Sequence, residues 1–577
     1  MLGRLRTLAV LAALAIAAAA AGLTALPPLD RDEARFAQAS TQMAESGDYL
    51  RIYFQDEQRN KKPAGIYWLQ AASVQMFSDP EARAIWAYRL PSVLGLVITV
   101  IAAYAAGCIL LGRRAAFAGA ALLAVGVLAG TEAGIAKTDM MLTACVTVAM
   151  AALAALYEGR SRWYGVLFWF AIACGVLIKG PIAPMVAGLS ILALVAVDRR
   201  LRWLSPVLFW PGLLLAITMI GGWLYSIQVA TDGAFLREAL LEDLGPKLVS
   251  AHESHNGWIG YHATFLAFLI FPGTLFLVPG LGLLVNAFVK PFADREAAGL
   301  RFLGAWAIPS WIVFELLPTK LIHYVLPLYP ALALIAGAAV SAIALRRIPV
   351  LAHLISVALF AAVGGVYAFV LLIAPRLLGA SAPPEVDESR ILEFLYETID
   401  LLRPEVQIGL AAVAGLLLIA PIVLWRAPRA VLLIAVAAGL AWHWSARYVV
   451  APSIEPLWIS ANVSERLEAY SLHPRVSPNA KPPLVSVGYN EPSLIFLTDT
   501  DTVLTDAVEA ARLAGAEAGR ATLVEARDRP AFEAELAAIG AGAVIVGEVR
   551  GLNYSRGDQV FITIYRRWQR ARERLDP

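Results

Sequence analysis

The sequence predicts a polytopic α-helical membrane protein that carries a small α/β domain at its C-terminal end. The chain has 577 residues, a mean hydropathy of +0.65 and 59% hydrophobic residues, but only 16% of its residues are charged. An ordinary soluble protein carries roughly 25% charged residues. Apolar runs of about 20 residues, the length that crosses a bilayer, recur along most of the chain. These observations exclude a soluble globular enzyme.

Thirteen apolar runs are long enough to be interpreted as membrane spans. The first follows Arg4 and Arg6 and so also has the features of a signal peptide, but its apolar stretch of about twenty residues is long enough to span. The thirteen runs cover residues 5–26, 91–111, 115–131, 139–157, 163–179, 181–197, 206–229, 261–288, 301–317, 322–343, 349–374, 406–425 and 429–449.

The short connections between these runs predict their orientation, because Lys and Arg collect in cytoplasmic loops. With the N-terminus in the cytoplasm, the inner loops carry most of the basic residues, as at Arg113 and Arg114. The short outer connections carry only Lys137, Lys179 and Lys320. This asymmetry supports the count of thirteen, and an odd count sends the segment from about residue 450 to the outer face.

The outer face also receives three long loops, residues 27–90, 230–260 and 375–405. Long loops without secondary structure are uncommon unless they have a function. From Pro482 onward the apolar runs shorten to strand length, at 484–487, 522–524, 543–546 and 560–565, with helical stretches at 505–518 and 530–539. The sequence therefore predicts a membrane domain over residues 1–450 and an outer α/β domain over residues 451–577.

The first outer loop opens with Asp32, Glu33 and Arg35, directly after a predicted span. A carboxylate at this surface is a candidate general base or metal ligand. Alternatively, Asp32 and Glu33 satisfy the free amides and the dipole at the start of an interfacial helix over residues 32–45. The residues alone leave both interpretations open.

Further along the same loop, Lys61 and Lys62 precede Pro63 and an aromatic pair, Tyr67 and Trp68. A lysine ammonium supplies charge and three donors to a phosphate, and the aromatic pair suits the headgroup boundary. The alternative is an interfacial helix that is anchored by snorkelling lysines. The segment is therefore a candidate phosphate site.

Other charged residues are predicted to lie on the same face. Asp139 stands at the outer mouth of a span, and an acid at the edge of the hydrocarbon is a functional candidate. Lys179 and Lys320 lie at outer span ends, where snorkelling anchors are the commoner role, and His323 and Tyr324 follow Lys320. Because acids and cations converge on one face beside long loops, they predict a site for an anionic lipid headgroup.

Together these motifs resemble the aminoarabinose–lipid A transferases and the related protein O-mannosyltransferases, membrane glycosyltransferases of the GT-C class that use polyprenyl-phosphate sugars. The resemblance covers most of residues 1–450 and implies a GT-C fold with thirteen spans. The matching residues are Asp32, Glu33, Arg35, Phe36, Ala37, Gly47, Asp48, Lys62, Pro63, Tyr67, Trp68, Thr138, Asp139, Lys179, Gly180, Pro181 and the segment 320–330.

The resemblance also implies an activity, a location and partners. It implies transfer of a sugar from a polyprenyl-phosphate donor to lipid A, lipopolysaccharide, another glycan or a protein, at the periplasmic face of the bacterial inner membrane. It implies that Asp32 is the main catalytic acid and Asp139 a second one. The implied donor-phosphate contacts are Arg35, Lys62, Lys247 and Tyr324, with Lys320 as a further cation and Glu33, Lys179 and His323 as further candidates.

The sequence departs from the family at Lys61, which stands where the family has glutamate. This change removes a potential metal ligand, so no metal site is predicted and dependence on a divalent ion stays open. Cys108, Cys145 and Cys174 lie in apolar runs without the spacing of metal ligands. The 47 basic and 45 acidic residues nearly balance and indicate no nucleic-acid partner.

Two other classes of protein stay open. A transporter or flippase of lipid-linked sugars would bind the same headgroup without needing Asp32 for chemistry, and it is expected to show paired broken helices and charges near the membrane midplane. A scaffold whose outer domain binds a partner would explain the C-terminal segment but not the acidic first loop.

Overall fold

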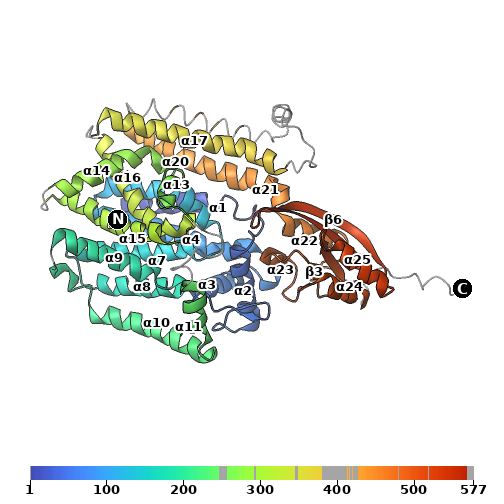
Figure 1. Cartoon of the computed structure of the whole chain (residues 1–577). Helices are drawn as coiled ribbons and strands as arrows, with labels where there is room; N and C mark the ends of the chain where they lie inside the picture. Colours follow the sequence, from blue (N-terminus) through green and yellow to red (C-terminus); the bar gives the residue numbers. More distant parts are fainter. Residues whose placement is uncertain are drawn as a thin grey trace.

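A computed structural model describes residues 2–567, except 200, 246–256, 291–293, 345–347, 479, 517–518 and nearly all of 380–426. A helical bundle occupies one side of the molecule, and a C-terminal β-sheet with its helices lies at one end of it (Figure 1). The N-terminus lies within the bundle, away from the sheet. The helices α2 and α3 of the first long loop lie between the two parts.

In the described part of the chain, eight helical segments are long and apolar enough to cross a membrane, or ten if each of two bent pairs counts as one span. Two further apolar helices are shorter, α8 (Tyr164–Lys179) and α9 (Ile182–Asp198). The eight contain α1 (Leu2–Ala20), α4 (Ile85–Leu110), α7 (Asp139–Tyr157), α10 (Trp210–Ala230), α15 (Arg295–Leu316), α16 (Tyr329–Ala344), α17 (Val350–Gly379) and α20 (Pro428–His443).

The predicted count of thirteen spans can therefore be compared segment by segment. Twelve of the thirteen predicted runs coincide with apolar helices or bent pairs in the described residues. The run at 406–425 lies outside the described residues. The structure thus supports eight to ten spans by length and composition, and the exact number stays a prediction.

Two of the predicted spans are bent, which the hydropathy pattern does not reveal. The first joins α5 (Arg113–Ala124) to α6 (Val127–Ala133) at 56°, and the second joins α13 (Tyr261–Leu269) to α14 (Leu277–Val289) at 105° through a short 3₁₀ turn. The two bends contact each other, because the amide of Val127 donates a 2.8 Å hydrogen bond to the carbonyl of Phe271.

Small residues let the central helices approach closely. A β-carbon on Gly119 of α5 would lie 2.6 Å from the carbonyl oxygen of Ala333 in α16, and one on Gly337 of α16 would lie 2.3 Å from that of Ala115. Membrane helices pack in this way because small side chains permit backbone contact where lipid gives no hydrophobic driving force. These contacts fix α16 against α5 in the centre of the bundle.

The first long loop folds into α2 (Asp32–Ser46), a short hairpin of β1 (Tyr53–Phe54) and β2 (Glu57–Gln58), and α3 (Gly65–Phe77). The predicted helix over 32–45 is thus confirmed. It ends at Gly47, whose φ of 72° is the left-handed conformation that favours glycine at a helix C-terminus.

The C-terminal segment contains a five-stranded sheet in the order β4-β3-β5-β7-β6. The strand β3 pairs in parallel with β4 and β5, and β7 pairs antiparallel with β5 and β6. One face of the sheet packs on α22 and α23, and the other packs on α24 and α25. The elements are α22 (Ile459–Ala469), β3 (Val485–Val487), α23 (Pro492–Leu497), β4 (Val503–Thr505), α24 (Ala507–Ala516), β5 (Ala521–Glu525), α25 (Arg529–Ala538), β6 (Ala543–Asn553) and β7 (Asp558–Arg567).

Candidate functional site

Asp139 forms the centre of a buried charged group at one end of the bundle. It is the first residue of α7 and is 5% exposed. The ammonium of Lys179, the last residue of α8, lies 2.6 Å from its carboxylate. The Nε2 atom of His323 lies 3.8 Å from the same carboxylate. The sequence placed these three residues on one face, and the structure brings them into one cluster.

Lys137 joins a second acid, Glu132, to this cluster. The Lys137 ammonium lies 2.9 Å from the Glu132 carboxylate, 4.0 Å from that of Asp139 and 3.4 Å from Nδ1 of His323. Burial alone would lower the pKa of Lys137. The negative charges of Glu132 and Asp139, with a smaller effect of Asp32, outweigh burial, so the pKa is raised above its usual value. Lys137 therefore keeps its charge between the two carboxylates.

Tyr324 borders the same group. The Lys179 ammonium lies 5.6 Å from the centroid of the Tyr324 ring, within the range of a cation–π contact, and the ring of His323 lies 5.4 Å away from it edge-on. His323 and Tyr324 belong to the short 3₁₀ segment Ile322–Leu328, so this segment brings both rings to the site.

Asp32 lies beside this group, because the next residue, Glu33, accepts a hydrogen bond from the amide of Ala136, one residue before Lys137. It is the first residue of α2 and its side chain is exposed. Arg35 lies three residues further along α2, so the two side chains share one face of the helix, and Arg35 is half-buried. Lys62 is half-buried three residues before α3. Asp32 and Arg35 thus come from α2, and Lys62 comes from the turn that precedes α3.

Glu33, in contrast, is occupied by a buried ion pair with Arg89 of α4. The side chains of the pair are 1% and 0% exposed, and two oxygen–nitrogen distances are 2.8 Å. Glu33 also accepts hydrogen bonds from the amides of Leu29 at 2.8 Å and Ala136 at 2.7 Å. These contacts fix the start of α2 against the segment before Asp139, so Glu33 has a structural role here.

The Arg89 guanidinium also binds the segment that follows α1. It donates to the carbonyls of Leu23 at 2.9 Å, Leu26 at 2.8 Å and Pro27 at 3.0 Å. A buried arginine that satisfies several carbonyls and one carboxylate costs little, because its fork of donors is fully used. Arg89 and Glu33 together therefore set the position from which the loop with Asp32 leaves the bundle.

Lys320, a predicted donor-phosphate cation, contacts the backbone of another segment. Lys320 is 5% exposed, and its ammonium donates a 2.8 Å hydrogen bond to the carbonyl of Gly257. Lys320 therefore binds the backbone just before α13, and Lys247 lies outside the described residues.

Sequence reasoning missed Glu132, Lys137 and Arg89 as parts of the site. Glu132 had a usable signal, because an acid within an apolar run is costly and is usually functional or paired. Among the described residues, no group of three or more His, Cys, Asp or Glu side chains has an arrangement that would hold a metal ion.

The arrangement suits an anionic substrate with a sugar group. Lys179, Arg35 and Lys62 present positive charge, while Asp32 offers an exposed carboxylate that can accept a proton. The buried acids Asp139 and Glu132 hold the cations of the cluster in place. Phosphate binding and general base catalysis are thus available at one end of the bundle.

Comparison with known proteins gives matches of sequence over part of the chain. The family model described as dolichyl-phosphate-mannose-protein mannosyltransferase matches residues 61–225. An undecaprenyl phosphate-alpha-4-amino-4-deoxy-L-arabinose arabinosyl transferase 2 of Pseudomonas fluorescens is 29% identical over 323 residues, 53% of this chain and 52% of that protein. A transferase of the same kind from Yersinia pestis is 26% identical over 314 residues, 53% of this chain and 54% of that protein. The chain thus matches about half the length of these relatives.

The structural match extends over nearly the whole molecule. The crystal structure of ArnT from Cupriavidus metallidurans bound to undecaprenyl phosphate aligns with a TM-score of 0.74 at 17% identity, over 96% of this chain and 97% of that one. The apo structure of the same protein aligns with a TM-score of 0.70. The resemblance indicated by the sequence motifs is confirmed: this chain has a GT-C fold like that of ArnT, and about half of its sequence is similar to aminoarabinose transferases.

Proposed function

We propose that the protein is a membrane glycosyltransferase that moves a sugar from a polyprenyl-phosphate donor to an acceptor of the cell envelope. The observation that carries this proposal is the cluster of Asp139, Lys179, Lys137 and His323 beside the exposed Asp32, whose neighbour Glu33 is bonded to the amide of Ala136. The similarity to transferases named for an undecaprenyl-phosphate sugar supports the donor class.

In the proposed reaction an acceptor hydroxyl attacks the anomeric carbon of the sugar. The new bond joins the acceptor oxygen to that carbon, the bond from the carbon to the phosphate oxygen breaks, and the polyprenyl phosphate leaves with the electron pair. The proton of the hydroxyl passes to the Asp32 carboxylate. If the acceptor is itself a phosphate, no base is needed, and Asp32 then orients the acceptor or stabilises positive charge on the sugar ring.

The cations stabilise the leaving group in this scheme. A phosphate departs as a weak base, so it requires positive charge rather than a proton donor. We assign Arg35, Lys62 and Lys179 to the donor phosphate, with Tyr324 beside them. Asp139 is assigned to holding Lys179 rather than to proton transfer, because its carboxylate is already bonded to that ammonium at 2.6 Å.

The proposal extends to placement in the membrane. We propose a division into a membrane domain, residues 1–450, and a periplasmic α/β domain, residues 451–577, with thirteen spans and a cytoplasmic N-terminus. The sheet and α2 lie at one end of the bundle (Figure 1), and the charged cluster lies beside them, because Phe496 of α23 packs with Ala34 of α2 and with Ala136. Their common position supports the proposal, since all of them were predicted on the outer face. The acceptor classes are lipid A, lipopolysaccharide, another glycan or protein.

The two bent spans are the one feature that favours a transporter of lipid-linked sugars, since such proteins use broken helices. A transporter is expected to carry substrate-binding charges at the breaks. Where the two bent spans meet, the described residues line a small cavity that has no charged side chain. The charged cluster lies instead at the ends of α7 and α8. The transferase is therefore the better-supported function.

A transfer assay on membranes tests the proposal. Radiolabelled polyprenyl-phosphate sugars and endogenous envelope acceptors are incubated with the wild type or the Asp32→Asn variant, and both free polyprenyl phosphate and labelled acceptor are measured. Asp56→Asn is the matched control, because Asp56 is an exposed acid at the hairpin turn of the same loop. Transfer by the wild type and the control but not by Asp32→Asn is expected. Movement of the lipid across vesicles without any transfer would favour the transporter.

A further inference from the structure

The start of α2 is bound by the C-terminal segment, which lies more than four hundred and fifty residues away in sequence. The hydroxyl of Ser493 in α23 donates to the carboxylate of Asp30. The amide of Asp30 donates a 2.6 Å hydrogen bond to the hydroxyl of Tyr554. Both the side chain and the backbone of Asp30 are thus held, two residues before Asp32.

Arg31, which lies between Asp30 and Asp32, links the fixed position of Asp30 to the start of α2. Arg31 has a φ of 62°, a left-handed conformation that is uncommon for a residue with a side chain. Such a conformation persists only where surrounding contacts impose it. The contacts of Asp30 on one side and the helix that starts at Asp32 on the other supply them.

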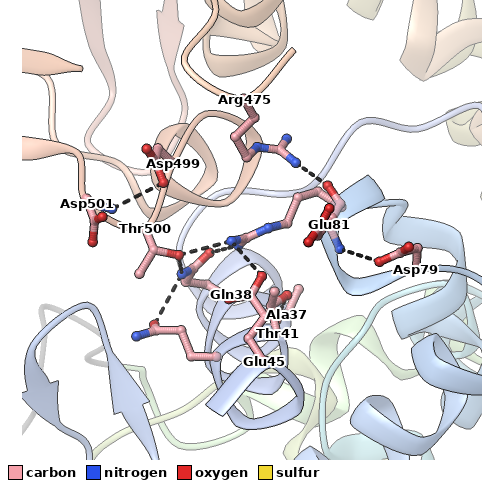
Figure 2. Close-up of polar contacts among 12 residues, drawn as sticks. Ala37, Gln38, Thr41, Glu45, Asp79, Glu81, Arg475, Asp499, Thr500 and Asp501 are labelled. Atoms are coloured by element: carbon pink, nitrogen blue, oxygen red, sulfur yellow. Dashed lines mark hydrogen bonds and ion pairs between the residues drawn. The ribbon is translucent and has the colours of Figure 1, made fainter. Parts of the chain in front are cut away.

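A second group of polar contacts holds the middle of α2 (Figure 2). Thr500 accepts hydrogen bonds on its hydroxyl from Gln38 at 2.8 Å and Arg83 at 3.0 Å. Its carbonyl and that of Thr502 accept from Gln55 at 2.9 and 2.8 Å. These bonds join the segment that follows α23 to α2, to the hairpin and to the turn before α4.

Arg475, in the C-terminal segment, makes a further contact with the turn before α4. It donates to the carbonyl of Glu81 (Figure 2). It also donates to the carbonyls of Leu497 and Thr498 at 2.7 Å each. One guanidinium therefore connects the end of α23 with the turn before α4.

An apolar contact completes the attachment. Phe496 of α23 is fully buried in a cluster with Ala34 and Ala37 of α2, Tyr88 of α4 and Ala136. Its ring lies 5.4 Å from that of Tyr88 in an edge-on arrangement. The cluster includes residues two positions after Asp32 and three before Asp139, so the C-terminal segment reaches both acid-bearing segments.

We propose that Ser493, Phe496, Thr500 and Tyr554 are positioning residues that hold α2 so that Asp32 faces the Asp139 cluster. This inference rests on the proposed transferase function, for which the orientation of Asp32 matters. It gives the C-terminal α/β segment a part in completing the site. Small displacements of a catalytic group cost about a hundredfold in rate, so the loss of these contacts is expected to act on kcat.

The test compares Ser493→Ala combined with Tyr554→Phe against Ser493→Thr, which keeps the hydroxyl. Hydrogen exchange of the amides of residues 29–38 in detergent-solubilised protein measures the attachment without any assay of activity. Faster exchange of this segment in the double variant, normal exchange in Ser493→Thr, and a kcat about tenfold lower with donor KM within twofold of wild type are expected. Unchanged exchange, or faster exchange with unchanged kcat, would overturn the proposal.

Phe496→Ala is an independent test variant, and Phe561→Ala is its control because Phe561 lies on β7 of the neighbouring sheet and is 41% exposed. The thermal unfolding curve identifies a variant that fails to fold. If Phe496→Ala fails to fold, the comparison of Ser493→Ala/Tyr554→Phe with Ser493→Thr tests the positioning role. If the wild type transfers no sugar but the exchange results are as expected, the attachment stands and the proposed function fails. If the wild type transfers sugar and exchange is unaltered, the function stands and the positioning role fails.

Discussion

The ammonium of Lys179 lies 2.6 Å from the carboxylate of Asp139, and both side chains are nearly enclosed, at 12% and 6% exposed. The two residues come from different helices, α8 and α7, and each stands at the terminal residue of its helix. A buried pair of this kind is costly to break because the remaining partner keeps its charge without compensation.

We therefore expect Lys179→Met and Asp139→Asn each to destabilise the protein by about 3–5 kcal/mol and to lower transfer about a hundredfold. The double variant should lose little more than either single variant, because both changes disrupt one interaction. Melting temperatures and kcat/KM of the three variants measure this. Additive losses would show that the two residues act separately.

The exposed pair of Lys290 and Asp294 provides the matched control. Its atoms lie 3.2 Å apart, but the side chains are 50% and 32% exposed. Exposed pairs contribute about 0–1 kcal/mol. Lys290→Met should therefore leave the melting temperature and the transfer rate close to those of the wild type.

Glu33 and Arg89 lead to a prediction about stability rather than substrate binding. Glu33→Gln leaves Arg89 without a counter-charge in a fully buried position, so a destabilisation of about 3–5 kcal/mol is expected. Donor KM should stay within twofold of wild type in protein that remains folded. Glu57→Gln, an exposed glutamate of the same loop, should change neither property. A raised donor KM without a change in melting temperature would instead assign Glu33 to the substrate.

Much of this fold could be predicted from the sequence, because its signals are local. The helix over α2 follows from acidic residues in its first turn and from Gly47 at its end, and β3, β5 and β7 follow from short apolar runs. The strand β4 was missed because Asp501 and Asp506 flank its three residues, whereas β3, of the same length, lies in the apolar run 484–487.

The remainder depends on contacts between distant residues. Hydropathy reports that residues 115–131 are apolar but not that the helix turns by 56° near Gly126, where the amide of Val127 bonds to the distant carbonyl of Phe271. The same applies to the attachment of Asp30 to Ser493, which lie 463 residues apart in sequence. Residue types could nominate Asp32 and Asp139, but not the side chains that hold them.

Asp30 gives a prediction of pH dependence. Burial raises the pKa of its carboxyl from 3.8 to about 6; the hydrogen bond from Ser493 and the charge of Arg31 lower it, and Glu491 raises it. The folded protein therefore holds this proton more tightly than the unfolded chain does. The contribution of Asp30 to stability is complete below pH 3.8 and is lost as the pH rises through about 6.

Hydrogen exchange at residues 29–38, corrected for the intrinsic rate, should accordingly increase in the wild type between pH 5 and pH 7.5. Asp30→Asn cannot titrate, so its exchange should not change over this range. Tyr489 and Tyr554 also face the carboxyl, and burial raises the pKa of both hydroxyls, so neither titrates in this window. An equal increase in the variant would assign the pH effect to another group.

Lys320 and Lys62 should respond differently to the same substitution. Lys320 donates to the Gly257 carbonyl, so Lys320→Met should speed hydrogen exchange at residues 257–263 and lower the melting temperature, with donor KM within twofold of wild type. Lys62→Met should instead raise donor KM about tenfold, because it removes a charged contact to phosphate. Lys320→Arg keeps a donor and should restore normal exchange. A rise in donor KM for Lys320→Met with normal exchange would return Lys320 to the donor site that its sequence position first indicated.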